Sequence, residues 1–111
     1  MTSQYNIAVM YDKGKGVLQD NAEAVKWYRL AAEQGNASAQ SNIGQMYLRG
    51  DGVLQDNIRS HMWLNIASAN GHKKAGEWRD ATAAKMTSAD ISKAQSMARE
   101  CMSSKYKNCG W

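Results

Sequence analysis

The residues of this chain that could catalyse a reaction or hold a metal are few and scattered. The sequence has two histidines, His61 and His72, and two cysteines, Cys101 and Cys109. A zinc site takes histidine, cysteine or carboxylate ligands at characteristic spacings, but neither histidine has a ligand residue four positions later. We therefore expect two ordinary surface histidines, no metal site and no cofactor.

Nucleophilic catalysis would require a serine or cysteine beside a base that a third group orients. No such arrangement is recognisable along the sequence, although groups far apart in a chain can converge in the fold. We expect no enzymatic activity, and a cysteine- or histidine-dependent hydrolase remains the alternative from a different functional class.

Two glycine pairs raise the separate question of phosphate binding. Residues 14–21 and 50–57 both contain the pattern G-x-G-V-L-Q-D-N. A dinucleotide-binding loop needs a third glycine and a preceding strand, and that position holds Gln19 in one copy and Gln55 in the other. A Walker-type loop would end in Gly-Lys-Ser/Thr, which is also absent. The glycines are therefore expected to shape turns between helices, with the valine after each pair packed into the core.

The duplicated string belongs to an internal repeat with a period of 36 residues, the distance from Gly14 to Gly50 (50 − 14). Such a fixed period, in the range of roughly 20 to 50 residues, indicates a solenoid in which each unit buries its apolar face against the next. Residues 4–39 and 40–75 share identities on both sides of the string, among them Gln4/Gln40, Asn6/Asn42, Ile7/Ile43, Met10/Met46, Tyr11/Tyr47, Trp27/Trp63, Ala31/Ala67, Gly35/Gly71 and Ala39/Ala75.

Each unit has the pattern of two amphipathic helices. Apolar residues recur at helical spacing before the glycine pair, as at Ile43 and Tyr47, and again after it. A glycine follows the first helix, where a left-handed residue commonly ends a helix, and Asp20 or Asp56 stands at the start of the second. The predicted fold is all-α, a solenoid (alpha-alpha superhelix) of antiparallel helix pairs.

This repeat resembles the Sel1-like repeat, a relative of the tetratricopeptide repeat. The resemblance covers residues 3 to about 75 and implies a right-handed superhelix of helix pairs. In the second copy it is carried by Ile43, Gly44, Tyr47, Gly50, Gly52, Val53, Asp56, Trp63, Ala67 and Gly71. In the first copy the match after the turn comprises Ala24, Trp27, Tyr28, Ala31, Ala32, Glu33, Gln34 and Gly35.

We expect a single domain over residues 1–111. It would comprise repeat 1 (1–35, partial at its start), repeat 2 (36–71), a degenerate half repeat (72–86), a C-terminal capping helix (87–103) and a tail (104–111). In the half repeat, Arg79 and Ala83 replace the isoleucine and tyrosine of the pattern. The capping helix should begin at Thr87 or Ser88, and its buried stripe should be Ile91, Ala94, Ala98 and Cys101.

The resemblance also implies a function. Proteins of this family act mainly as adaptors that hold a protein or peptide on a concave face, which the first helix of each unit lines. The corresponding positions lie six before, two before and one after the repeat tyrosine. The implied contact residues of a non-enzymatic protein-binding module are Tyr5, Val9, Asp12, Ser41, Gln45, Leu48, Glu77, Ala81 and Ala84. An alternative is a structural segment of a longer repeat protein, whose open first edge would self-associate when uncovered.

The cysteines are interpreted in the light of the same resemblance. The family has a cysteine-rich branch with one pair per repeat, some members of which are described as penicillin-binding. This chain lacks those pairs, which argues against a hydrolase of that branch. The spacing of Cys101 and Cys109, together with the frequent export of family members in bacteria, leads us to expect a disulfide that joins the tail to the last helix. Export likewise favours a periplasmic or secreted bacterial protein.

The net charge of +4 lies entirely within residues 73–111, which carry eight basic and four acidic side chains. Because the lysines are scattered along the sequence, we expect a solvated helical surface and no nucleic-acid binding. No stretch approaches the roughly 18 to 20 apolar residues that would span a membrane. Most aromatic residues fall at core positions of the repeat, and those left for ligand contact are Tyr5, Trp78, Tyr106 and Trp111.

Overall fold

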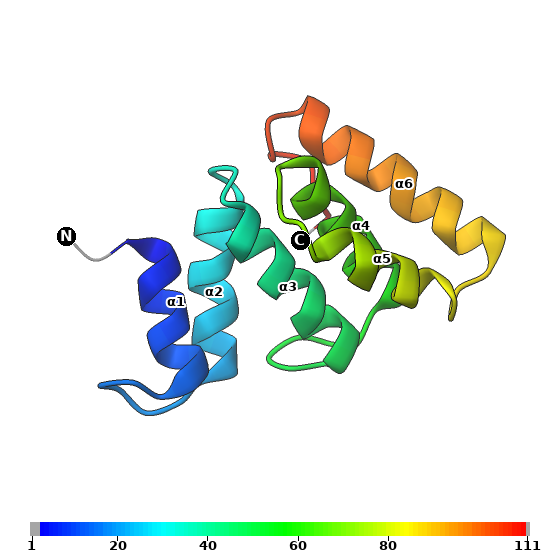
Figure 1. Cartoon of the computed structure of the whole chain (residues 1–111). Helices are drawn as coiled ribbons and strands as arrows, with labels where there is room; N and C mark the ends of the chain where they lie inside the picture. The colour runs from blue at the N-terminus through cyan, green and yellow to red at the C-terminus, as the bar shows by residue number, and fades with distance from the viewer. Residues whose placement is uncertain (1–2, 111) are drawn as a thin grey trace.

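The computed structural model describes residues 3–110, which form α-helices joined by short connections with no β-strand in that range (Figure 1). The prediction of an all-α fold is confirmed. In chain order the helices are α1 (Gln4–Lys13), α2 (Asn21–Ala32), α3 (Ala37–Arg49), α4 (Asn57–Ala69), α5 (Ala75–Ala83) and α6 (Ser88–Ser103).

The helix ends follow local signals in the sequence. Gly14 and Gly50 end α1 and α3 in the left-handed conformation, with φ of 69° and 76°, as the repeat pattern predicted. In α1, α2, α3, α4 and α6, the N-cap side chain accepts a hydrogen bond from the backbone N–H three residues later, which typically stabilises a helix by about 1 kcal/mol. These N-caps are Ser3, Asp20, Asn36, Asp56 and Thr87.

Consecutive helices pack against each other from α1 through α5, and the chain is elongated, with extents of 43 × 26 × 24 Å (Figure 1). This side-by-side stacking is the predicted solenoid arrangement. The last helix differs, because α6 packs mainly on α4 and not on α5, the helix before it. Helix α4 is therefore covered by α3, α5 and α6. Among the described helices, none combines the length and the apolar character that crossing a membrane requires.

The core follows the predicted stripes. A main cluster joins α1, α2, α3, α4 and α6, and a smaller one lies between α4 and α5. In the capping helix, Ala94, Ala98 and Cys101 are buried and Ile91 is half-buried. The largest fully buried side chains of the main cluster are Tyr28, Ile43, Met46, Met62, Trp63 and Ile66, and the smaller cluster comprises Leu64, Ala67 and Ala75 with Trp78 packed against it.

Helices α3 and α4 approach each other closely at Gly44. A β-carbon at this position would lie 2.7 Å from Cγ and 2.8 Å from Cδ2 of Leu64, whereas carbon atoms in ordinary contact are about 3.5–4.0 Å apart. The absence of a side chain at Gly44 therefore sets the distance between the two helices of repeat 2.

The glycine pairs form turns, and the turn of the second copy also contacts the first repeat. A β-carbon on Gly52, where φ is +74°, would lie 2.6 Å from the carbonyl oxygen of Asn21 at the start of α2. The glycine thus lets the turn of repeat 2 contact the backbone of repeat 1. Val53 packs against the main core, as expected, and Val17 is half-buried. The next residue in each turn, Leu18 or Leu54, is almost fully exposed, which the sequence did not predict.

Candidate functional site

A hollow of about 280 Å³ lies against α3 and α5. Gln45, Leu48 and Arg49 line it from one turn of α3, and Trp78 and Ala81 line it from one face of α5. Three of the nine predicted contact residues, Gln45, Leu48 and Ala81, therefore lie around one cavity. A mostly apolar hollow with a few polar groups at its edge is typical of a ligand-binding surface.

The wall and rim of this hollow are held by further contacts. The Trp78 ring packs on the core between α4 and α5, and its centroid is 5.6 Å from that of the His72 ring. At the rim, Nε of Arg49 donates to Oδ2 of Asp51 at 2.8 Å, and Nη1 of Arg49 donates to Oε1 of Gln45 at 3.4 Å. The hollow can thus accept an apolar side chain against Leu48 and Trp78, while polar atoms remain at its edge.

The predicted contact residues of α1 are largely engaged in internal packing. Val9 packs against the core. The carboxylate of Asp12 accepts a hydrogen bond from the Tyr28 hydroxyl at 3.0 Å. Burial, and then the nearby Asp12 carboxylate, raise the pKa of Tyr28 far above its ordinary value. Asp12 therefore stabilises the packing of α1 on α2.

One predicted contact residue is contradicted by the structure. Ser41 is only 1% exposed, so its side chain does not reach an open surface. It lies on α3, which has α2 on one side and α4 on the other, and a side chain as small as serine does not extend beyond these neighbours. The prediction of Ser41 as a contact residue was wrong.

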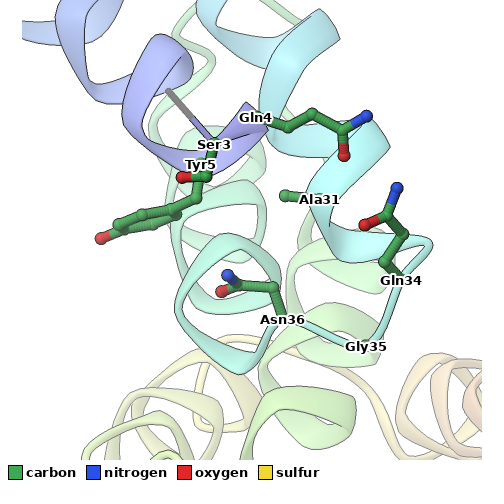
Figure 2. Close-up of a pocket in the computed structure, with 7 residues that line it drawn as sticks. All are labelled: Ser3, Gln4, Tyr5, Ala31, Gln34, Gly35 and Asn36. Carbon is green, nitrogen blue, oxygen red and sulfur yellow. The ribbon is translucent and has the colours of Figure 1, made fainter. Parts of the chain in front are cut away.

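Tyr5 lies at a separate hollow of about 330 Å³ at one end of α1 and α2. Figure 2 shows this site between the start of α1, the end of α2 and the connection into α3, with Tyr5 on one side and Gln34 on the other. The Tyr5 ring also packs 5.9 Å, centroid to centroid, from that of Tyr28. Glu77 and Ala84 are exposed on and just after α5, and neither lines the cavity between α3 and α5.

The expectation of two surface histidines was wrong for His61. Its side chain is 3% exposed, and its Nδ1 atom has no hydrogen-bond partner. Burial, and then the nearby Arg79 guanidinium, lower the pKa of His61. His72 is half-buried, and its Nδ1 accepts a hydrogen bond from the backbone N–H of Ala75 at 3.2 Å. Within residues 3–110, no group of three His, Cys, Asp or Glu side chains is placed to hold a metal.

The two cysteines form a disulfide, Cys101–Cys109, and both are buried. Neither sulfur is therefore available as a thiolate nucleophile in this oxidised form. The disulfide closes the tail into a loop after α6, and Arg59 Nε donates to the carbonyl oxygen of Gly110 at 2.8 Å. The tail is thereby held against the start of α4.

A hydrogen-bonded chain of side chains connects both repeats to this tail. The amide of Gln40, which is fully buried, donates to the Ala32 carbonyl oxygen at 3.0 Å. The amide of Asn70 donates to Oε1 of Gln40 at 2.8 Å and to the Tyr106 hydroxyl at 2.9 Å. Tyr106, one of the aromatics left for ligand contact, thus anchors the tail internally. Trp111, another of them, lies outside the described residues.

Sequence reasoning missed Arg49 at the rim of the hollow and named Trp78 only as an unassigned aromatic. A basic residue in the last turn of a helix is common, since it interacts favourably with the helix dipole, so Arg49 gave no distinctive signal. Trp78 lies in the degenerate unit, one position after Glu77, which was predicted instead.

The sequence comparison agrees with this geometry. The model of the Sel1 repeat matches residues 2–36 and 37–72. The chain belongs to the Sel1 repeat family. Sel1 repeat proteins are helical repeat modules that generally mediate protein interactions and are typically non-catalytic. No curated protein sequence matches the chain significantly.

Solved structures also resemble this Sel1 repeat protein, two of them over most of its length. One is c5321, a protective antigen present in uropathogenic Escherichia coli strains that displays an SLR fold; its TM-score is 0.87 and its sequence is 30% identical, over 93% of this chain. The other is a Sel1 repeat protein from Oxalobacter formigenes, with a TM-score of 0.68 and 34% identity over 69% of this chain. The aligned part spans only 23% of the first protein and 58% of the second.

Proposed function

We propose that this chain is a non-enzymatic protein-binding module whose partner, a peptide segment of another protein, lies on the concave face of the solenoid. The hollow between α3 and α5 would receive one apolar side chain of that segment. The observation that carries the proposal is the meeting of Gln45, Leu48 and Ala81 with the Trp78 ring around one cavity. The oxidised cysteines and the buried His61 support a role other than catalysis.

The chemistry of the hollow suits an aliphatic or aromatic anchor. Leu48, Trp78 and Ala81 supply an apolar wall, and the Gln45 amide can donate to a peptide carbonyl group while its oxygen faces Arg49. Burying one leucine-sized side chain is worth about 1.5–3 kcal/mol, whereas a micromolar complex needs about 8 kcal/mol. The partner must therefore extend beyond this hollow, and we propose the separate hollow at Tyr5 as a second contact point.

The proposal can be tested with the Ala81→Glu variant. The probe is a peptide selected by display for binding to the original folded chain. Ala81 is exposed on α5, so a glutamate there fills the hollow without disturbing the core. We expect the affinity, measured by fluorescence anisotropy, to fall by at least about tenfold, because a charge then occupies the apolar anchor site. Ala89→Glu, at an exposed site on α6, is the matched control and should bind normally.

A second measurement uses Gln45→Ala together with Leu48→Ala. The helical circular dichroism spectrum should persist, while binding of the selected peptide weakens further than with either single change. If every peptide obtained by display binds Ala81→Glu and the double variant as tightly as the original protein, the proposed face is incorrect.

We also propose a second role, as a structural segment of a longer repeat protein. It is supported by the match of 93% of this chain to only 23% of the c5321 structure. In such a protein a neighbouring repeat would pack on the side of α1 that α2 does not cover. When that side is uncovered, we expect self-association, which light scattering at increasing protein concentration would detect as a rising mean mass.

A further inference from the structure

We propose that the disulfide-closed loop of residues 101–109 forms a second interaction surface, which binds an acidic segment of a partner protein. The surface is separate from the hollow between α3 and α5. It centres on a cavity of about 340 Å³ lined by Arg29 of α2, by Glu33 directly after that helix, and by Lys105, Tyr106 and Lys107 of the loop.

The first observation is the backbone of the loop. Lys105 and Tyr106 have φ of 56° and 67° and are the only non-glycine residues with positive φ between residues 3 and 110. This left-handed conformation is unfavourable for residues with a side chain and persists where the surroundings impose it, often at functional sites. Here it is imposed by the Cys101–Cys109 disulfide and by the hydrogen bond from the Tyr106 N–H to the Cys101 carbonyl oxygen, 2.8 Å.

The second observation is the direction of the side chains. Tyr106 is half-buried, and its hydroxyl accepts the hydrogen bond from Asn70. Lys105 and Lys107, the residues on either side of it, are exposed. Because the tyrosine is fixed to the body of the protein, the backbone on either side of it is fixed too, and both lysines line the cavity together with Arg29.

The third observation is the charge of the cavity. Three cations, Arg29, Lys105 and Lys107, face one carboxylate, Glu33. Arg29 is paired with Glu33 at 3.0 Å, with about half of its side chain exposed. Neither Lys105 nor Lys107 forms an ion pair with any residue in the range 3–110. The structure thus gathers, beside α2, two of the basic residues that gave the last third of the sequence its net positive charge.

A carboxylate-bearing peptide fits this surface better than a nucleic acid does. Single-stranded nucleic acid requires aromatic rings on which bases stack, but the Tyr106 ring is half-buried and its hydroxyl is engaged by Asn70. The Glu33 carboxylate would also repel the closely spaced phosphate groups of a nucleic acid. The cavity accommodates one or two side chains, and glutamate or aspartate side chains pair with separate lysines in such a space.

The test uses a fluorescein-labelled, glutamate-rich peptide of about ten residues and measures its affinity by anisotropy at about 20 mM salt, where surface charges are weakly screened. Replacing both loop lysines (Lys105→Gln, Lys107→Gln) should weaken binding roughly tenfold. The matched control (Lys73→Gln, Lys74→Gln) makes the same change in net charge at exposed residues before α5, and it should weaken binding less than about twofold.

Two further variants separate the alternatives. Cys101→Ser with Cys109→Ser opens the loop and should weaken binding at least about fivefold, with circular dichroism used to verify the helices. Ala81→Glu should leave the affinity within about twofold, which distinguishes this surface from the hollow between α3 and α5. Equal losses in the two lysine variants, unchanged binding by the serine variant, or tighter binding of a single-stranded oligonucleotide than of the peptide would overturn the proposal.

Discussion

Replacing Gly44 by alanine tests the packing of α3 on α4. The added methyl group would lie 2.7 Å from Cγ of Leu64, 2.8 Å from Cδ2 and 3.2 Å from the backbone nitrogen. The backbone nitrogen moves only with α4, and the Leu64 side chain is fully buried, so we expect the two helices to separate. Overpacking of this kind costs about 1–3 kcal/mol, and so short a contact should cost an amount near the upper end of that range. In the opposite direction, alanine favours the helix over glycine by about 1 kcal/mol. The free energy of unfolding should therefore fall by about 1–2 kcal/mol.

The assay is urea unfolding followed by circular dichroism and by tryptophan fluorescence, whose coincidence tests for a two-state transition. The midpoint should decrease at constant slope, and the melting temperature should fall by roughly 5–10 °C. Gly76→Ala is the matched control, since the nearest atoms to its methyl group would be Ser68 Oγ at 3.2 Å and Arg79 Nη2 at 3.8 Å, with Ser68 Cβ in ordinary contact at 3.9 Å. The one tight contact is with the rotatable Ser68 hydroxyl, which can move, so the free energy of unfolding should stay the same or rise slightly.

A double-mutant cycle identifies Leu64 as the cause. Leu64→Ala alone should cost about 2–5 kcal/mol because it leaves a cavity, but in the Gly44→Ala background the new methyl group occupies part of that space. The loss of unfolding free energy in the double variant should be smaller than the sum of the two single losses by at least about 1 kcal/mol. Strict additivity, or a Gly44→Ala variant as stable as the original chain, would refute this account of the interface.

Three further predictions concern the turns, the buried histidine and the tail. Gly52→Ala should destabilise the protein by at least about 2 kcal/mol more than Gly16→Ala in urea unfolding: both positions are left-handed, but only the former contacts the backbone of α2 closely. The pKa of His61 is lowered in the fold, so its imidazole binds a proton more readily in the unfolded chain. The free energy of unfolding should therefore be highest above about pH 6.5 and should fall as the pH drops below this value, by at most about 1.4 kcal/mol per pH unit. His61→Gln should reduce this slope in a pH series of thermal melts, and His72→Gln should retain it. Tyr106→Phe should lower the unfolding free energy by about 0.5–1.5 kcal/mol, since one hydrogen bond to the tail is lost.

The helices and their order could be predicted from the sequence because their signals are local. The aspartates at positions 20 and 56 cap helices through a backbone N–H three residues away, and the glycines at 14 and 50 end helices at their own φ angles. A 36-residue period then required equivalent units to stack. None of these inferences needed knowledge of which residues lie opposite each other in space.

The surface could be predicted only in part. Spacing along α3 placed Gln45 and Leu48 on one face, but the hollow exists only because Trp78 and Ala81 of α5 lie opposite them. The pattern treated Ser41 and Tyr5 as equivalent, since they occupy the same position in the two repeats. They differ because α2 and α4 flank α3, whereas α1, among the described helices, packs mainly on α2.

The sequence by itself determined a repeated helical hairpin, its turns and the family to which the chain belongs. These depend on caps, glycines and periodicity, all of which act within a few residues or recur at a constant interval. Only the tertiary structure decided that α6 returns to α4, that His61 is buried, and that two lysines of the closed loop lie beside Arg29. Burial and the clustering of charges depend on which distant segments cover one another, and a single sequence does not encode that information locally.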